Sequence, residues 1–310
     1  MPPTPRPPHP LATVEQIVSN PSAQDGIPAD VESDLRVAGC MMIQEAGILL
    51  ELPQSTMATA QVIFHRFFYV SSMLSFGVND LSVSALYLAT KLNETPVRMR
   101  DLINTYMYLH ARIKHLLAQP AGAPLSQLAG SSRSGSDKGK QRAEVWDGFA
   151  FSVPSFHSTV FWEWKEAIQY NESQLLKRLG FNMQVDLPYS HVINYLRILD
   201  LVFEKGVAQL CWSILNDALL TPLYAQQPTH VLAVMSILLA TRLRRIPLPE
   251  GWYLLFDVTW DDIWPCCGTV MQLWRDWGLG DYSDDSNGSG NTDTNEDEQR
   301  AKEDRWRRAG

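Results

Sequence analysis

One short sequence occurs twice in this chain, and each copy closes an apolar stretch. Residues 88–92 read LATKL and are separated by three residues from Pro96; residues 239–243 read LATRL and are separated by three residues from Pro247. The offset is 151 residues, about 30 of which belong to a Gly/Ser-rich segment. Similarity at a fixed distance is typical of a repeated structural unit. We therefore predict two copies of one unit; the alternative is a chance match in a Leu/Ala-rich chain.

The repeated unit is expected to be helical. Apolar residues recur at three- and four-residue spacing, as in Leu35, Ala38 and Met42, which is the period of a helix that faces a core. No segment shows the strict alternation of a half-buried strand, so we predict an all-α fold with two tandem five-helix repeats. The expected helices cover residues 35–50, 53–68, 79–92, 98–117, 155–180, 188–204, 207–220, 228–244, 249–256 and 259–277.

Composition divides the chain into a helical part and three other regions. The first residues are rich in proline, a middle segment is rich in Gly and Ser, and the end is acidic. Such segments lack the apolar residues needed to form a core, so we expect disordered termini and a flexible insert. The predicted regions are a disordered segment 1–29, a first repeat 30–181 with an insert at about 119–150, a second repeat 187–279 and a disordered tail 280–310.

The charge distribution argues against nucleic acid and membrane partners. The formal net charge is −8, and the tail from Asp281 onward, with nine acidic and five basic residues, carries −4 of it. The remainder lacks the basic stripe that binding to phosphates requires. The longest apolar run, residues 231–240, is about half of what a membrane-spanning helix needs. No signal peptide is expected at the start, so we predict a soluble intracellular protein.

Residue patterns that carry catalysis are not found in the sequence. The four cysteines, Cys40, Cys211, Cys266 and Cys267, form neither a disulfide framework nor a CxxC metal knuckle and suit core packing. No phosphate-binding loop, nucleophile elbow or protein-kinase signature occurs. We therefore expect no enzyme activity, no cofactor, no metal and no small-molecule ligand. An active site assembled from distant positions is the alternative.

Several stretches resemble the cyclin family, and its cyclin L branch in particular. The resemblance spans roughly residues 30–278, interrupted by the Gly/Ser-rich insert. It implies two tandem cyclin boxes, each of five helices. The stretches are 34–40 (DLRVAGC), 44–54 (QEAGILLELPQ), 57–62 (MATAQV), 66–69 (RFFY), 98–104 (RMRDLIN), 179–181 (LGF), 195–196 (YL), Trp212 with Asn216 and Asp217, and 246–249 (IPLP).

The resemblance implies a kinase partner and a site. Cyclins hold the regulatory helix of a cyclin-dependent kinase in its active orientation, which closes the Lys–Glu pair that the kinase needs. The residues that correspond to the usual anchors are Lys91 and Glu172, and we place Leu92, Glu94 and Leu175 beside them. A lysine offers three donors to backbone carbonyls, and a carboxylate accepts from amides. Without the resemblance, Lys91 would be read as an ordinary cation at a helix C-terminus and Glu172 as a solvated residue.

Some features depart from the family pattern. Asn93 stands where an acidic residue is usual, so Glu94 would act alone. Residues 35–39 lack the Leu and Trp of the substrate-docking patch of cell-cycle cyclins. The tail contains no Arg-Ser repeat, which argues against a role in splicing speckles. The short basic runs 138–142 and 305–308 are interpreted as solvated residues, with nuclear import as the alternative. The second repeat has Arg242 and Arg245 in the places of Lys91 and Glu94, which suggests that only the first repeat binds the kinase.

The preferred interpretation is a nuclear regulatory subunit. It would form a heterodimer with a cyclin-dependent serine/threonine kinase and act in RNA polymerase II transcription or pre-mRNA processing. Two alternatives stay open: a protein like transcription factor IIB, which shares the two-repeat helical fold, and a scaffold that has the fold without activating a kinase.

Overall fold

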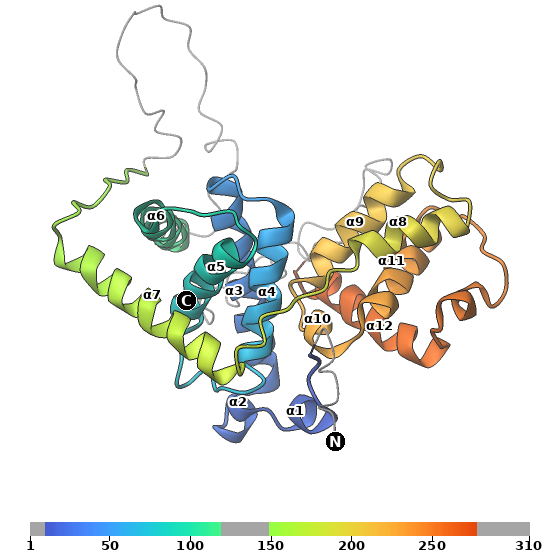
Figure 1. The fold of residues 1–310 in the computed structure, drawn as a ribbon, viewed down its shortest axis with the longest axis horizontal. Helices are drawn as coiled ribbons and strands as arrows, with labels where there is room; N and C mark the ends of the chain where they lie inside the picture. The colour runs from blue at the N-terminus through green and yellow to red at the C-terminus, as the bar shows by residue number, and fades with distance from the viewer. Residues whose placement is uncertain (1–9, 119–148, 278–310) are drawn as a thin grey trace, which may run out of the picture.

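The computed structural model describes residues 10–118 and 149–277, and all regular structure within these two ranges is helical (Figure 1). The predicted all-α class is therefore confirmed. Most of the predicted insert, the first nine residues and the predicted tail lie outside the described residues.

Two groups of helices follow one another along the chain and form two lobes (Figure 1). The helices agree with the predicted ones to within a few residues, except that the first begins earlier and the sixth ends at Ile198. The first group is α3 (Ala29–Leu49), α4 (Gln54–Phe67), α5 (Val78–Leu92), α6 (Met99–Ala118) and α7 (Thr159–Arg178). The second is α8 (Tyr189–Ile198), α9 (Val207–Ala218), α11 (Thr229–Leu243), the 3₁₀ helix η2 (Trp252–Phe256) and α12 (Trp260–Trp277), with the short α10 (Leu223–Gln226) before α11.

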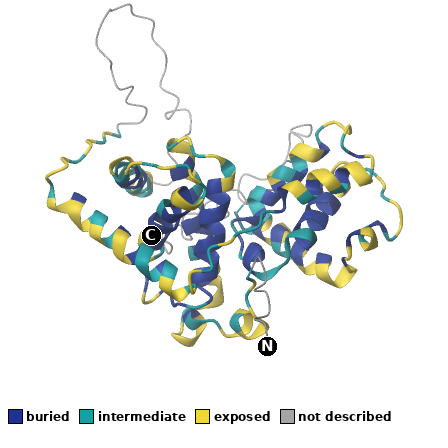
Figure 2. Cartoon of the chain, in the orientation of Figure 1, coloured by how far each residue is buried: buried dark blue, intermediate teal, exposed yellow. Residues whose placement is uncertain are grey.

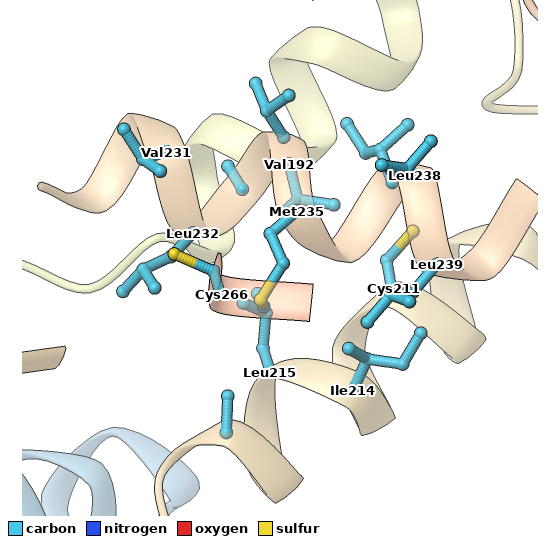
Figure 3. Close-up of a cluster of buried hydrophobic side chains, with 14 of the residues drawn as sticks. Val192, Cys211, Ile214, Leu215, Val231, Leu232, Met235, Leu238, Leu239 and Cys266 are labelled. Carbon is cyan, nitrogen blue, oxygen red and sulfur yellow. The ribbon is translucent and has the colours of Figure 1, made fainter. Parts of the chain in front are cut away.

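Each lobe is built around its third helix. Helix α5 contacts α3, α4, α6 and α7, and α11 contacts α8, α9, η2 and α12 in the same way. Small residues permit this close packing: Ala85, Ala89 and Ala240 are fully buried. Figure 3 shows the core around α11, where Met235 lies between α9 and α12. A helix that is apolar on nearly all sides is stable only when it is surrounded.

The two central helices also end in the same way. The backbone N–H of Thr95 donates to the carbonyl of Thr90 at 2.9 Å, and that of Ile246 donates to the carbonyl of Thr241 at 2.9 Å. The residues just before, Glu94 and Arg245, have left-handed backbone conformations with φ of 53° and 57°. This 6→1 bond after a left-handed residue is the Schellman motif. The same motif also ends α3, α7 and α8, so the repeat that the LATKL and LATRL sequences predicted is confirmed instead by the matching packing around α5 and α11.

Helix α4 joins the two lobes. Its Ala58 and Val62 are fully buried in the core of the second lobe. His65 Nε2 donates to the carbonyl of Leu219 at 3.0 Å, and Arg66 Nη1 donates to the carbonyl of Gln184 at 2.8 Å. Figure 2 shows α4 buried along most of its length between the lobes. The lobes are thus held by buried contacts as well as by the chain that links them.

The N-terminal segment differs from its predicted disorder. Residues 1–9 lie outside the described residues, but two short helices follow, α1 (Val14–Val18) and α2 (Pro21–Gln24). Their first turns are capped by the side chains of Thr13 and Asn20, a local signal that the proline-rich composition concealed. The N–H of Ala12 donates to the carbonyl of Ala225 at 2.7 Å, and that of Met73 donates to Ser22 Oγ at 3.1 Å. The segment therefore contacts both lobes.

All four cysteines are free and buried, as core packing predicts. Across residues 10–118 and 149–277, no helix combines the length and the apolar character needed to cross a membrane.

Candidate functional site

The two residues that were predicted to anchor a partner are in contact with each other. Lys91, in the last turn of α5, places its Nζ 2.6 Å from Oε1 of Glu172 in α7. The same ammonium group lies 4.1 Å from the centre of the Tyr87 ring. The Lys91 side chain is 46 % exposed and that of Glu172 is 15 % exposed. The pair therefore lies at the surface where α5 and α7 meet, on one side of the first lobe.

Local sequence explains how these side chains are positioned. Tyr87 is four residues before Lys91, the spacing that puts two side chains on the same face of a helix. On α7, Ile168, Asn171 and Leu175 are buried and turn this face of the helix toward the lobe. Glu172 is the next residue after the buried Asn171, so its side chain lies at the edge of this buried face. A cation near a helix C-terminus is also favoured by the helix dipole.

The remaining predicted residues divide between the surface and the core. Leu92 is 39 % exposed beside Lys91, and Glu94 is exposed in its left-handed position just beyond the helix end. Leu175 is fully buried in the chain on its own, and its contact with a partner stays a prediction. It lies one turn beyond Asn171 on the inward stripe of α7. Its side chain packs that helix onto the lobe and presents nothing at the surface.

Sequence reasoning missed the contributions of Tyr87 and Asn93. Tyr87 supports the ammonium group through a cation–π contact, and its spacing from Lys91 was the available signal. Asn93 Nδ2 donates to Thr59 Oγ1 at 3.0 Å and thereby ties the end of α5 to α4. The amide that replaces the usual acidic residue thus faces the neighbouring helix.

The equivalent position in the second lobe is built differently. Arg242 and Arg245 are both exposed, and neither forms an ion pair within the part of the chain that the structure describes. The first lobe therefore presents a joined cation and anion, whereas the second presents unpaired cations. This supports the expected divergence of the two repeats.

A buried Cys–His contact in the first lobe has the residue types of a nucleophile and a base. Sγ of Cys40 lies 3.1 Å from Nε2 of His65. Burial lowers the pKa of His65 to about 3, with the Arg36 guanidinium adding to the effect, and burial raises the pKa of the Cys40 thiol well above its ordinary value. Both groups are thus kept neutral, and both are fully buried. The contact is a packing feature. Over the described ranges, no group of three or more His, Cys, Asp and Glu residues is arranged to hold a metal ion.

Comparison with known proteins identifies similar sequences and similar folds. Residues 11–116 match the family model described as "Cyclin, N-terminal domain". The chain is 34 % identical over 256 residues to Cyclin-L2 of Mus musculus, covering 82 % of this chain and 43 % of that protein. It is 33 % identical over 268 residues to Cyclin-L1 of Homo sapiens, covering 86 % of this chain and 44 % of that protein. The chain thus spans less than half the length of these relatives.

Two solved structures have a similar fold. One is a chain of the yeast RNA Pol II CTD kinase CTDK-1 complex, with a TM-score of 0.62, 16 % identity and coverage of 86 % of this chain and 73 % of that chain. The other belongs to the CAK complex of Chaetomium thermophilum, with a TM-score of 0.50, 15 % identity and coverage of 77 % and 62 %. At this level of identity the likeness concerns the fold.

Proposed function

The chain belongs to the cyclin family and is similar to cyclin L, and from this we propose that it binds and activates a cyclin-dependent serine/threonine kinase. In this proposal it is the regulatory subunit of a heterodimer and does no catalysis itself. The observation that carries the proposal is the Lys91–Glu172 pair, which a cyclin fold exposes where α5 meets α7.

The geometry suits the recognition of a helix end. The Lys91 ammonium has three donors, of which the Glu172 carboxylate occupies one in the free chain. The others remain for backbone carbonyls of a partner, and the carboxylate retains sites for backbone amides. The contact with Tyr87 and Glu172 restricts the long lysine side chain before binding, which lowers the entropy lost in the complex.

Apolar surface around the pair would supply most of the affinity, and the charges would fix the register of the partner. Leu92, exposed beside Lys91, is one apolar side chain of this kind. A partner helix fixed in this way would keep the kinase's own Lys–Glu pair closed over ATP.

The finer proposal is a nuclear role in RNA polymerase II transcription or pre-mRNA processing. It is supported by the similarity to Cyclin-L1 and Cyclin-L2 and by the fold shared with a chain of an RNA Pol II CTD kinase complex. The particular kinase is left to experiment.

The test is co-purification. The tagged chain is isolated from its host, and the eluate is assayed for phosphorylation of a synthetic peptide with Ser-Pro repeats. We expect kinase activity to co-elute with the wild-type chain and to fall at least about 10-fold with Lys91→Ala plus Glu172→Ala, a loss of about 1.4 kcal/mol or more. The matched control is Arg242→Ala plus Arg245→Ala, which changes the equivalent positions of the other repeat and should leave the activity unchanged.

Three results would contradict the proposal in different ways. If no kinase co-elutes, the chain is not a kinase subunit. If the double variant retains the activity, the site lies elsewhere. If a kinase co-elutes but is no more active than the kinase alone, the chain is a scaffold.

A further inference from the structure

A pocket of about 410 Å³ lies at the outer end of the second lobe, away from the Lys91–Glu172 pair. It is formed where α11 ends, along the loop that follows and beside the start of α12. Its lining combines polar and apolar groups, and it includes two prolines and three aromatic side chains. The lining residues that matter here are Arg242, Pro247, Pro249, Glu250, Tyr253 and Trp260.

Large apolar side chains around this pocket remain exposed. Leu254 and Leu255 in η2 are 62 % and 68 % exposed, and Trp264 on the first turns of α12 is 57 % exposed. The rings of Trp260 and Trp264 stack with centroids 5.8 Å apart and an angle of 22° between their planes. A gathered, exposed apolar surface of this kind marks an interaction site more often than a lone exposed residue does.

The pocket is lined by one charged residue of each sign, Arg242 and Glu250. At the end of α11, Arg242, Arg244 and Arg245 are exposed, and none of them forms an ion pair within residues 10–118 and 149–277. Asp261, beside the lining residue Trp260, is exposed at the start of α12. A ligand that carries its negative charge toward the exposed arginines and places prolines or other apolar groups beside the aromatic side chains would complement this lining.

We propose that this pocket docks an extended segment of a partner protein in which Asp or Glu residues stand next to a proline-rich apolar stretch. The acidic residues would pair with Arg242 and Arg245, whose guanidinium groups bind carboxylates in a two-pronged manner. The prolines would lie against Tyr253 and Trp260, since aromatic-lined grooves recognise polyproline II segments.

The charge pattern favours a peptide over a nucleic acid strand. A nucleic acid carries phosphates at regular intervals and would bring some of them against Glu250 and Asp261. A peptide can confine its negative charge to the end that meets the arginines. The repeat provides a further argument. The end of α5, which we assign to the kinase, carries the Lys91–Glu172 pair, whereas the corresponding end of α11 carries exposed arginines without an acidic partner in the described residues.

The test is a selection with random twelve-residue peptides displayed on phage, panned on the full chain. We expect the enriched peptides to combine acidic residues with proline, and to bind at least about 10-fold more weakly to Arg242→Glu plus Arg245→Glu. Trp260→Ala should also weaken peptide binding, because Trp260 lines the pocket. The side chain is 41 % exposed, so its removal should leave the core intact. Lys91→Ala plus Glu172→Ala is the matched control and should bind the peptides as wild type does.

Each variant is first checked for a wild-type thermal unfolding curve, and the charge-reversal variant also for kinase co-purification, so that loss of fold is separated from loss of the pocket. The proposal is overturned if no enriched peptide depends on Arg242 and Arg245, or if a single-stranded oligonucleotide binds the same residues more tightly than the peptides. It is also overturned if peptides bind only after residues 278–310 are removed, because the acidic tail of the chain itself would then be the occupant.

Discussion

The ammonium group of Lys91 lies 2.6 Å from the carboxylate of Glu172, although 81 positions separate the two residues in the sequence. The contact exists because α7 packs against the central helix α5 with Leu175 turned into the core. It gives the surface a fixed cation and anion side by side, an arrangement suited to binding the polar backbone at a helix end.

The charge-exchanged variant Lys91→Glu plus Glu172→Lys separates the structural role of this pair from its role in binding. An exposed ion pair contributes only about 0–1 kcal/mol, and the exchanged pair preserves the attraction. We expect the melting temperature to stay within about 3 °C of wild type, as thermal unfolding followed by circular dichroism would show. Kinase co-purification should nevertheless stay at the level of Lys91→Ala plus Glu172→Ala, because donors and acceptors have changed places. Recovery of binding by the exchange would argue against the site.

His65 should make the stability of the chain depend on pH. Burial lowers its pKa to about 3 in the folded chain, below the ordinary value of 6.5 that applies after unfolding. The unfolded chain therefore takes up a proton first, and the free energy of unfolding should fall as the pH decreases below about 6.5. From pH 6.5 to 5 the loss from this residue should be about 1.5 kcal/mol.

The comparison is with His65→Gln, which retains a side-chain donor but cannot titrate. Urea unfolding of both proteins at several pH values measures the difference. Parallel curves for the two proteins over this range would show that His65 is not the group responsible.

Replacing glycine by alanine should change the stability of the chain differently at three helical positions. A methyl group at Gly39 would meet the ring of Phe64, which is fully buried and cannot yield, so Gly39→Ala should cost about 1–3 kcal/mol. At Gly47 the obstacle is the flexible side chain of Met57, and the cost should be smaller. Gly268 has nothing within 4 Å, so Gly268→Ala should stabilise the chain by about 1 kcal/mol through helix propensity. Denaturant midpoints of the three variants give the order, and a destabilised Gly268→Ala would be inconsistent with an open helix face there.

The cysteines should be unreactive in the folded chain. Burial raises the pKa of Cys266 to about 11 and those of Cys211 and Cys267 to about 12, and that of Cys40 further still. Because the thiolate is the reactive form, a disulfide reagent should label almost none of them at a pH of about 8. All four should react once guanidinium chloride unfolds the chain. Rapid labelling of the native protein would reveal opening of the core around α11 or α4.

Much of the fold was predictable because it rests on local signals. The three- to four-residue apolar period located the helices, and the repeat of LATKL as LATRL located the two central ones. Both central helices end in a Schellman motif with a left-handed residue, Glu94 or Arg245, as α3, α7 and α8 also do. The ordered segment from Thr13 to Gln24 was missed, since its order depends on capping side chains and on contacts with distant residues such as Ala225.

The site shows the same division more sharply. The sequence alone determined which residue types stand at 91, 92, 94, 172 and 175, and the family resemblance suggested that they act together. Only the tertiary structure decided that Lys91 and Glu172 touch, that Leu175 is buried, and that Arg242 borders a pocket. The physical reason is that helix period fixes which side chains share a face. What that face contacts depends on tertiary packing: of α7 against α5 in the first lobe, and of the loop after α11 against its neighbours in the second. Neither arrangement is determined by the sequence of one segment.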